Sequence, residues 1–198
     1  MKKTIMSLAV VSALFSAGAM AAPAANDAST ATLNFTGRVT SSLCQVDTGS
    51  VEQNISLGEV SASALKATGI APAKSFSVSL VNCDTGTGKI TYNIADANSA
   101  GAATTAAYLQ PISEDDSAGG VGVFIQTSDH KDVTIGQDND FAVVKDQQNN
   151  ALSTQTIALT AYMATTNKAA DTDGSKVTPG TVSARGVMTI KATAPAMG

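Results

Sequence analysis

The side chains of this sequence that could do chemistry are few and widely separated. The one histidine, His130, stands in a Ser-Asp-His-Lys-Asp stretch that superficially offers the nucleophile, base and acid of a hydrolytic triad. The turn around it is polar and supplies no apolar walls, so a solvated loop histidine is the better interpretation. No paired carboxylates stand in a recognisable cleft pattern. The sequence therefore predicts a protein that is not an enzyme.

Two acidic runs begin like cation-binding loops, at residues 114–116 (Glu-Asp-Asp) and 171–174 (Asp-Thr-Asp-Gly). Neither continues with the ligand spacing of an EF-hand, which closes with a glutamate far along the loop. Residues 86–89 (Gly-Thr-Gly-Lys) lack the upstream glycine and the following Ser or Thr of a phosphate-binding loop. We therefore expect no metal and no cofactor.

The first 21 residues have the three parts of a cleavable signal peptide. Lys2 and Lys3 form a basic start, residues 5–15 are apolar, and Ala19-Met20-Ala21 fits the small-x-small cleavage rule. The apolar run is too short to cross ~30 Å of hydrocarbon, and no second run of spanning length follows. We expect export and no stable membrane insertion. The net charge of −4, which becomes more negative without the two lysines, argues against nucleic acid as a partner.

Cys44 and Cys83 are the only cysteines of the chain. An even number of cysteines in an exported protein predicts a structural disulfide. A redox-active pair would need a close spacing such as Cys-x-x-Cys. A zinc site would need more ligands than two distant thiols and one histidine can supply.

Alternation of apolar and polar residues predicts strands along most of the mature chain, and scarce aromatics with many small and β-branched residues suit close sheet packing. The predicted strands are residues 33–43, 51–57, 75–83, 89–95, 122–127, 154–164 and 184–192. The segment 154–164 is apolar on both faces, which is typical of a central strand. Residues 61–68 could form a single helical turn. Residues 84–88, 113–120, 137–140, 147–150 and 165–180 are rich in turn-forming residues. The fold class is thus all-β, an antiparallel sandwich.

Six short motifs occur in order along the mature chain. They are Leu33-Asn-Phe35-Thr-Gly37 before the first cysteine, Val51-Glu-Gln-Asn-Ile55-Ser-Leu57-Gly58-Glu-Val60, Phe76-Ser-Val78-Ser-Leu80-Val-Asn-Cys83-Asp84, Val121-Gly122-Val123-Phe-Ile125, Ala161-Tyr162-Met-Ala164 and Val177-Thr-Pro179-Gly180. Together with the signal peptide and the cysteines, they resemble the chaperone–usher pilins, specifically the type 1 fimbrial major-subunit family.

The resemblance implies an incomplete immunoglobulin-like sandwich, the pilin domain of residues 37–198, which lacks its final strand. A donor-strand arm, residues 22–36, precedes it. In that family a periplasmic chaperone lends the missing strand, and at the outer-membrane usher the arm of the next subunit replaces it. Carried onto this sequence, the donor face is Ser29, Ala31, Leu33 and Phe35. The final strand of the chain, which would pair with the chaperone or the donor, contains Met188, Ile190 and Ala192.

The expected function is that of a structural subunit of a surface fimbria, exported through the periplasm and polymerised by donor-strand exchange into an adhesive fibre. Its expected partners are identical or related pilin subunits, the periplasmic chaperone and the outer-membrane usher. A single domain with an arm favours the major rod subunit. Two alternatives stay open: a minor or adaptor fimbrial subunit, and a self-contained secreted β-sandwich that binds a ligand. The sequence departs from the family pattern in having Ala31 where a glycine is usual and in continuing beyond the final strand to Gly198.

Overall fold

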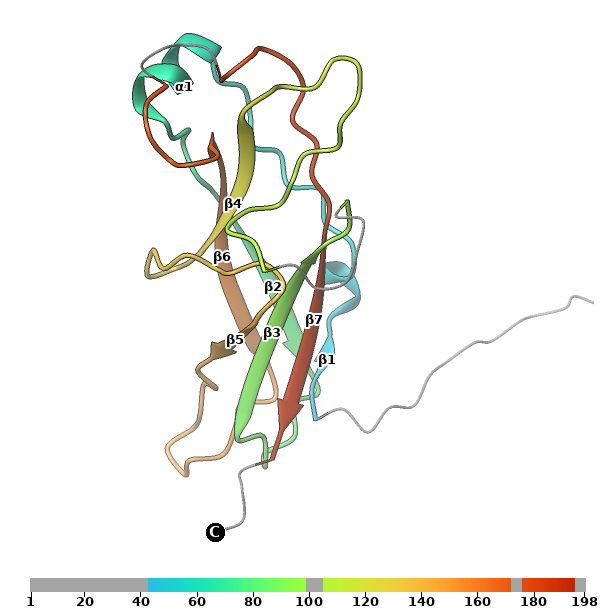
Figure 1. Ribbon diagram of the computed structural model, residues 1–198. Coiled ribbons are helices and arrows are strands. Elements are labelled where there is room, and N and C mark those ends of the chain that lie inside the picture. The colour runs from blue at the N-terminus through green and yellow to red at the C-terminus, as the bar shows by residue number, and fades with distance from the viewer. Residues whose placement is uncertain (1–42, 99–104, 172–175, 195–198) are drawn as a thin grey trace, which may run out of the picture. The chain divides into compact units, whose positions relative to one another are not determined.

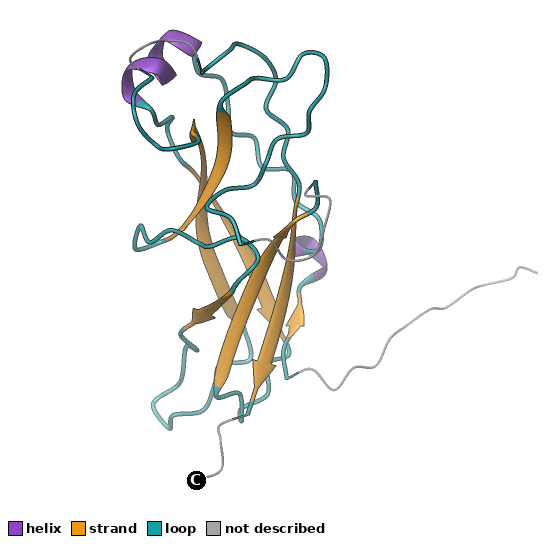
Figure 2. Ribbon diagram, viewed as in Figure 1, coloured by secondary structure: helices purple, strands orange, loops and turns teal. Residues whose placement is uncertain are grey.

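The computed structural model of the chain describes residues 43–98, 105–171 and 176–194 (Figure 1). Within them, two antiparallel sheets are joined by loops and accompanied by one short α-helix and one 3-10 turn (Figure 2). The first sheet has the strand order β1-β2-β6-β4, and the second has the order β5-β3-β7. The strands are β1 (Gln45–Val46), β2 (Lys74–Val81), β3 (Lys89–Asp96), β4 (Val121–Thr127), β5 (Asp138–Phe141), β6 (Gln155–Thr165) and β7 (Gly186–Thr193).

One apolar core joins the two sheets. Alternate residues of β3 face it, namely Ile90, Tyr92 and Ile94, each at most 4% exposed. The first sheet contributes its own alternate residues to the same cluster: Leu80, Val123, Ile125, Ile157 and Leu159. This period-2 burial from two facing sheets confirms the predicted all-β antiparallel sandwich.

Five of the predicted strands are present as β2, β3, β4, β6 and β7. β6 is central, as expected, because it pairs with β2 on one edge and with β4 on the other. Both of its faces are buried only from Ala161 onward, while Thr156 and Ala158 are exposed. The predicted strand at 33–43 lies outside the described residues except for its last position.

The predicted strand at 51–57 is wrong. A 3-10 turn, η1 (Thr48–Ser50), takes the chain away from β2 just after β1. Side chains then satisfy part of the β2 edge: Ser79 N donates to Ser50 Oγ at 3.1 Å, and Gln53 Nε2 donates to Ser77 O at 2.8 Å. Val51 is 71% exposed, so the alternation in this segment does not mark a paired strand.

The predicted helical turn is confirmed as α1 (Ala62–Thr68). Ser61 caps its start, since its Oγ accepts from Ala64 N at 3.1 Å. Gly69 ends it in the left-handed conformation, with φ of 75°, which glycine adopts without steric cost. Leu65 is the buried residue of the helix and packs in a second apolar cluster with Val121, Met163 and Val177.

Candidate functional site

Strand β7 lies at the edge of its sheet. It pairs with β3 over its whole length, from Gly186 opposite Asp96 to Thr193 opposite Lys89. No strand among the described residues pairs with its other edge. An unpaired edge presents a row of backbone donors and acceptors that can template another strand.

The hydrogen bonds at the two ends of β7 show which of its residues point their backbone groups toward the open edge. Arg185 O accepts from Ala97 N at 2.9 Å, and Thr193 O accepts from Gly88 N at 2.8 Å. Backbone groups of successive strand residues point to alternate edges, so the odd-numbered residues of β7 bond to β3. The N–H and C=O groups of Met188, Ile190 and Ala192 therefore point to the open edge.

The side chains of these three residues are half-buried and pack against the main core, whereas Thr189 and Lys191 between them are exposed. Leu57, outside any strand, packs against the same core and is also only half-buried. Open-edge backbone groups thus stand beside incompletely covered apolar side chains. This is the combination that strand addition requires, because main-chain bonds dock the added strand and alternate side chains fill pockets.

The structure thus brings together the predicted final-strand residues Met188, Ile190 and Ala192. Their pairing with a chaperone or a donor strand stays a prediction. The donor face (Ser29, Ala31, Leu33 and Phe35), the signal peptide (residues 1–21) and the arm (residues 22–36) lie outside the described residues, and their roles also stay predictions.

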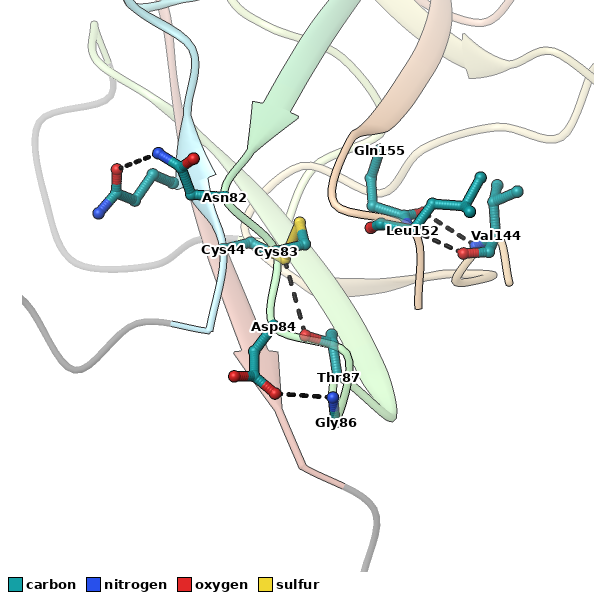
Figure 3. The surroundings of a disulfide bond; sticks show 10 residues. Cys44, Asn82, Cys83, Asp84, Gly86, Thr87, Val144, Leu152 and Gln155 are labelled. Carbon is teal, nitrogen blue, oxygen red and sulfur yellow. Dashed lines mark hydrogen bonds between the residues drawn. A yellow bond between two sulfur atoms is a disulfide. The ribbon is translucent and has the colours of Figure 1, made fainter. Parts of the chain in front are cut away.

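The predicted disulfide between Cys44 and Cys83 is present, with Cα atoms 4.0 Å apart (Figure 3). Both cysteines are 6% exposed and belong to the main core. Cys44 directly precedes β1 and Cys83 closely follows β2, so the bond fastens these two antiparallel strands at one end. Beyond it, Asp84 Oδ1 accepts from Gly86 N at 2.7 Å and shapes the turn that leads into β3.

The residues that superficially suggested chemistry have structural roles. His130 is exposed and adopts φ of 61° in a tight turn, where its N–H donates to Thr127 O at 3.0 Å. Asp171 is buried, and its Oδ2 accepts from the backbone N–H groups of Lys176 and Val177, each at 3.0 Å. These bonds fasten Asp171 to the backbone at the start of the next described segment. Neither residue stands in a catalytic arrangement with other described side chains.

Two solved structures share this fold, which defines the class of the protein as pilin-like. One is a chaperone–usher pilus whose structure concerns rod uncoiling; the match has a TM-score of 0.61, with 22% identity over 83% of this chain and 96% of that one. The other is the P pilus rod subunit PapA, with a TM-score of 0.56 and 20% identity over 76% of this chain and 99% of that one.

Sequence comparisons give the family. The family model described as "Fimbrial protein" matches residues 33–192. Fimbrial protein 987P of Escherichia coli is 53% identical over 191 residues, which is 96% of each chain. The type-1 fimbrial protein A chain of E. coli K12 is 36% identical over 86 residues, 43% of this chain and 47% of that one. The chain belongs to the fimbrial protein family and is a structural subunit of a surface fimbria.

Among the described residues, no helix is long and apolar enough to cross a membrane.

Proposed function

We propose that this protein is the major rod subunit of its fimbria and that it polymerises by donor-strand exchange. In this proposal the segment carrying Ser29, Ala31, Leu33 and Phe35 of one copy adds as a strand along β7 of another copy. The observation that supports it is the open edge of β7, where Met188, Ile190 and Ala192 combine outward-facing backbone groups with half-buried side chains.

The free energy expected for binding of the donor segment along β7 is favourable but moderate. Leu33 and Phe35 would each contribute about 1.5–3 kcal/mol by burial. Each of the three edge residues of β7 offers one N–H and one C=O, and each net backbone bond adds about 1 kcal/mol. Long fibre lifetimes therefore rest on kinetic stability, because the donor leaves only when a cooperatively folded sandwich opens.

The same open edge supports a role for a periplasmic chaperone. An unpaired strand with apolar neighbours is an aggregation hazard before assembly, so it needs a temporary cover. The usher would then exchange that cover for the arm of another subunit. No catalysis, metal or cofactor is part of this proposal.

The proposal is tested by shearing surface material from cells that co-express a chaperone and an usher, then running it unboiled on a denaturing gel. The full-length protein should give a ladder of detergent-resistant multimers. A variant that lacks residues 22–35 should give only monomer or chaperone-bound subunit. Folded monomer from both the full-length protein and the deletion variant would instead mean that the sandwich is complete without a donor.

The position of the subunit in the fibre needs a separate measurement. Immunogold labelling of intact fimbriae should decorate the whole length of the fibre if this is the major rod subunit. Label confined to the tip or to rare positions would assign the protein as a minor or adaptor subunit, while leaving donor-strand exchange intact.

A further inference from the structure

The connection between η1 and α1 contains a short motif that the function proposed above does not use. Residues 52–56 read Glu-Gln-Asn-Ile-Ser, so Glu52, Asn54 and Ser56 stand at two-residue spacing. An asparagine followed two positions later by Ser or Thr, with no proline between them, is the acceptor motif of N-linked glycosylation. The transferases that act in the bacterial periplasm also require an acidic residue two positions before the asparagine. Asn54 therefore has the complete periplasmic motif.

No other asparagine of the sequence has this complete motif. Asn34 is followed by Thr36 but lacks an acidic residue two positions before it. Asn98 follows Asp96 but lacks a Ser or Thr two positions after it. The chain thus contains one full motif and two incomplete ones, and the incomplete motifs serve as internal controls for the full one.

The side chains of the full motif are open to solvent. Every residue from Glu52 to Ser56 is exposed, including the apolar Ile55, which is 38% exposed. Among the described residues, neither the amide of Asn54 nor the hydroxyl of Ser56 has a hydrogen-bond partner, and Glu52 forms no ion pair. All three groups that a transferase recognises are therefore available to it in the folded protein.

The backbone of this segment is also unpaired. Residues 52–59 lie outside the helices and strands, and they form no backbone–backbone hydrogen bond with other described residues. A transferase must lift the asparagine and its neighbours away from the acceptor protein to place them in its active site. Each backbone bond that had to break would oppose this step. In residues 52–59 that cost is absent.

Two contacts hold the segment at the surface of the sandwich. Gln53 Nε2 donates to Ser77 O at 2.8 Å, and Leu57 packs against the main core just after the motif. The bond from Gln53 is exposed and is the one side-chain hydrogen bond that the motif makes with other described residues. Lifting Asn54 therefore costs one solvent-accessible hydrogen bond and leaves the packing of Leu57 in place.

Asn98 is in the opposite situation. Its Nδ2 donates to Gln110 O at 3.2 Å, and its backbone N–H donates to Asp96 Oδ1 at 2.9 Å. Asp96 Oδ2 accepts from Gln110 N at 2.8 Å. Both the amide and the acid of this incomplete motif are thus already bonded within the fold, which would oppose their recognition by an enzyme.

We propose that Asn54 is a site of N-linked glycosylation, modified in the periplasm by a membrane-bound oligosaccharyltransferase. The co-substrate is an oligosaccharide whose first sugar is joined through C1 to a polyprenyl diphosphate. Asn54 Nδ2 forms a bond to that C1 while the bond from C1 to the diphosphate oxygen breaks, and the electron pair leaves with the diphosphate. Nδ2 gives up one proton to solvent, and no oxidant or reductant is needed. Glu52 and Ser56 position the segment on the enzyme.

The test co-expresses the full-length chain and a chaperone with an oligosaccharyltransferase that requires the acidic residue, together with the enzymes that make a lipid-linked oligosaccharide of known mass. Mass spectrometry of the periplasmic subunit should show one added glycan, which peptide fragmentation places on Asn54. Asn54→Gln should remove it. Glu52→Gln and Ser56→Ala should each lower the modified fraction about tenfold or more. Asn34 should stay unmodified in every variant.

A further variant separates the motif from its structural setting. Ala100→Ser completes the motif around Asn98, where the amide and the acid are already bonded, so modification of Asn98 should stay about tenfold or more below that of Asn54. Two outcomes would overturn the proposal: an unmodified Asn54 while a control acceptor in the same cells is glycosylated, or equal modification of Asn98 and Asn54 in Ala100→Ser. Neither outcome depends on donor-strand exchange, because the assay uses the subunit before it is assembled.

Discussion

The side-chain amide of Gln155 forms hydrogen bonds with both the backbone N–H and the backbone C=O of Val144. Its Nε2 donates to Val144 O and its Oε1 accepts from Val144 N, each at 2.8 Å, and Nε2 also donates to Leu152 O at 2.9 Å (Figure 3). Gln155 is 1% exposed and stands in the inward-facing row of β6 with Ile157 and Leu159. A polar residue occupies this apolar row because its amide closes the base of the loop that precedes β6.

Replacing Gln155 by leucine should lower the free energy of unfolding by about 2–4 kcal/mol, because three backbone groups lose their partner in a part-buried site. Urea unfolding of the purified full-length chain measures the change. Gln148→Leu is the control: Gln148 is exposed in the same loop, and only its backbone N–H is bonded there, to Asp146. Equal stabilities of the two variants would show that the hydrogen bonds of the Gln155 side-chain amide do not stabilise the fold.

Loss of the disulfide should also destabilise the fold, through a different mechanism. The bond closes a loop with a sequence separation of 39 residues. In the chain-entropy description, removing such a crosslink costs about 4 kcal/mol by freeing the unfolded chain. The double variant Cys44→Ala with Cys83→Ala should unfold at correspondingly lower urea. An unchanged midpoint would mean that packing around β1 and β2 already fixes this end of the sandwich.

Lys168 covers an aromatic pair on β4 and β6. Its Nζ lies 4.6 Å from the ring centroid of Phe124 and 2.6 Å from Asp132 Oδ2, and Phe124 stacks on Tyr162 with centroids 5.7 Å apart. Lys168→Met keeps an apolar stem but removes the charge. We expect the free energy of unfolding at neutral pH to fall by about 1 kcal/mol, mostly from the cation–π contact, because the ion pair is partly solvated.

The pH dependence of this variant has a definite sign. The hydrogen bond from Lys168, with a smaller contribution from Gln126, lowers the pKa of Asp132 from its ordinary value of 3.8. A carboxylate with a depressed pKa stabilises the fold above that ordinary value, and this stability disappears as the pH falls through the folded-state pKa. The difference between wild type and Lys168→Met should therefore shrink below about pH 4. A difference that grows on acidification would contradict the pairing.

The sequence predicted strands well where one face is buried and poorly where pairing depends on distant residues. β3 alternates Ile90, Tyr92 and Ile94 with polar residues, and this alternation correctly predicted a strand. β5 was missed because its sequence Asp-Asn-Asp-Phe has low strand propensity. It pairs because β3 offers it an edge, with ion pairs from Lys89 to Asp140 and from Lys191 to Asp138.

The same limit applies to the sites. Alternation showed that Met188, Ile190 and Ala192 share a face, and the family resemblance assigned them to the final strand. Which edge of that strand is open depends on sheet order, which no local pattern encodes.

The acceptor side of the proposed joint is tested with Ile190→Asp. Ile190 packs against the main core from the centre of β7, so a carboxylate there would meet the apolar face of an incoming strand. We expect surface multimers to disappear. Thr189→Asp is the matched control, because Thr189 is adjacent but exposed, and fibres should form normally. Fibres from Ile190→Asp would exclude the open edge of β7 as the acceptor.

The donor side is tested with Phe35→Asp, which should leave secretion intact but abolish multimers, whereas Thr36→Asp on the opposite face should still polymerise. Combining the two defective subunits separates the roles. Phe35→Asp retains an intact β7 edge and Ile190→Asp retains an intact arm, so co-expression should yield one detergent-resistant dimer and no longer species. A full ladder from this mixture would mean that polymerisation uses another surface. Failure to form even the dimer would show that at least one substitution damages the subunit itself or prevents its capture by the chaperone, which uses the same edge of β7 in this proposal.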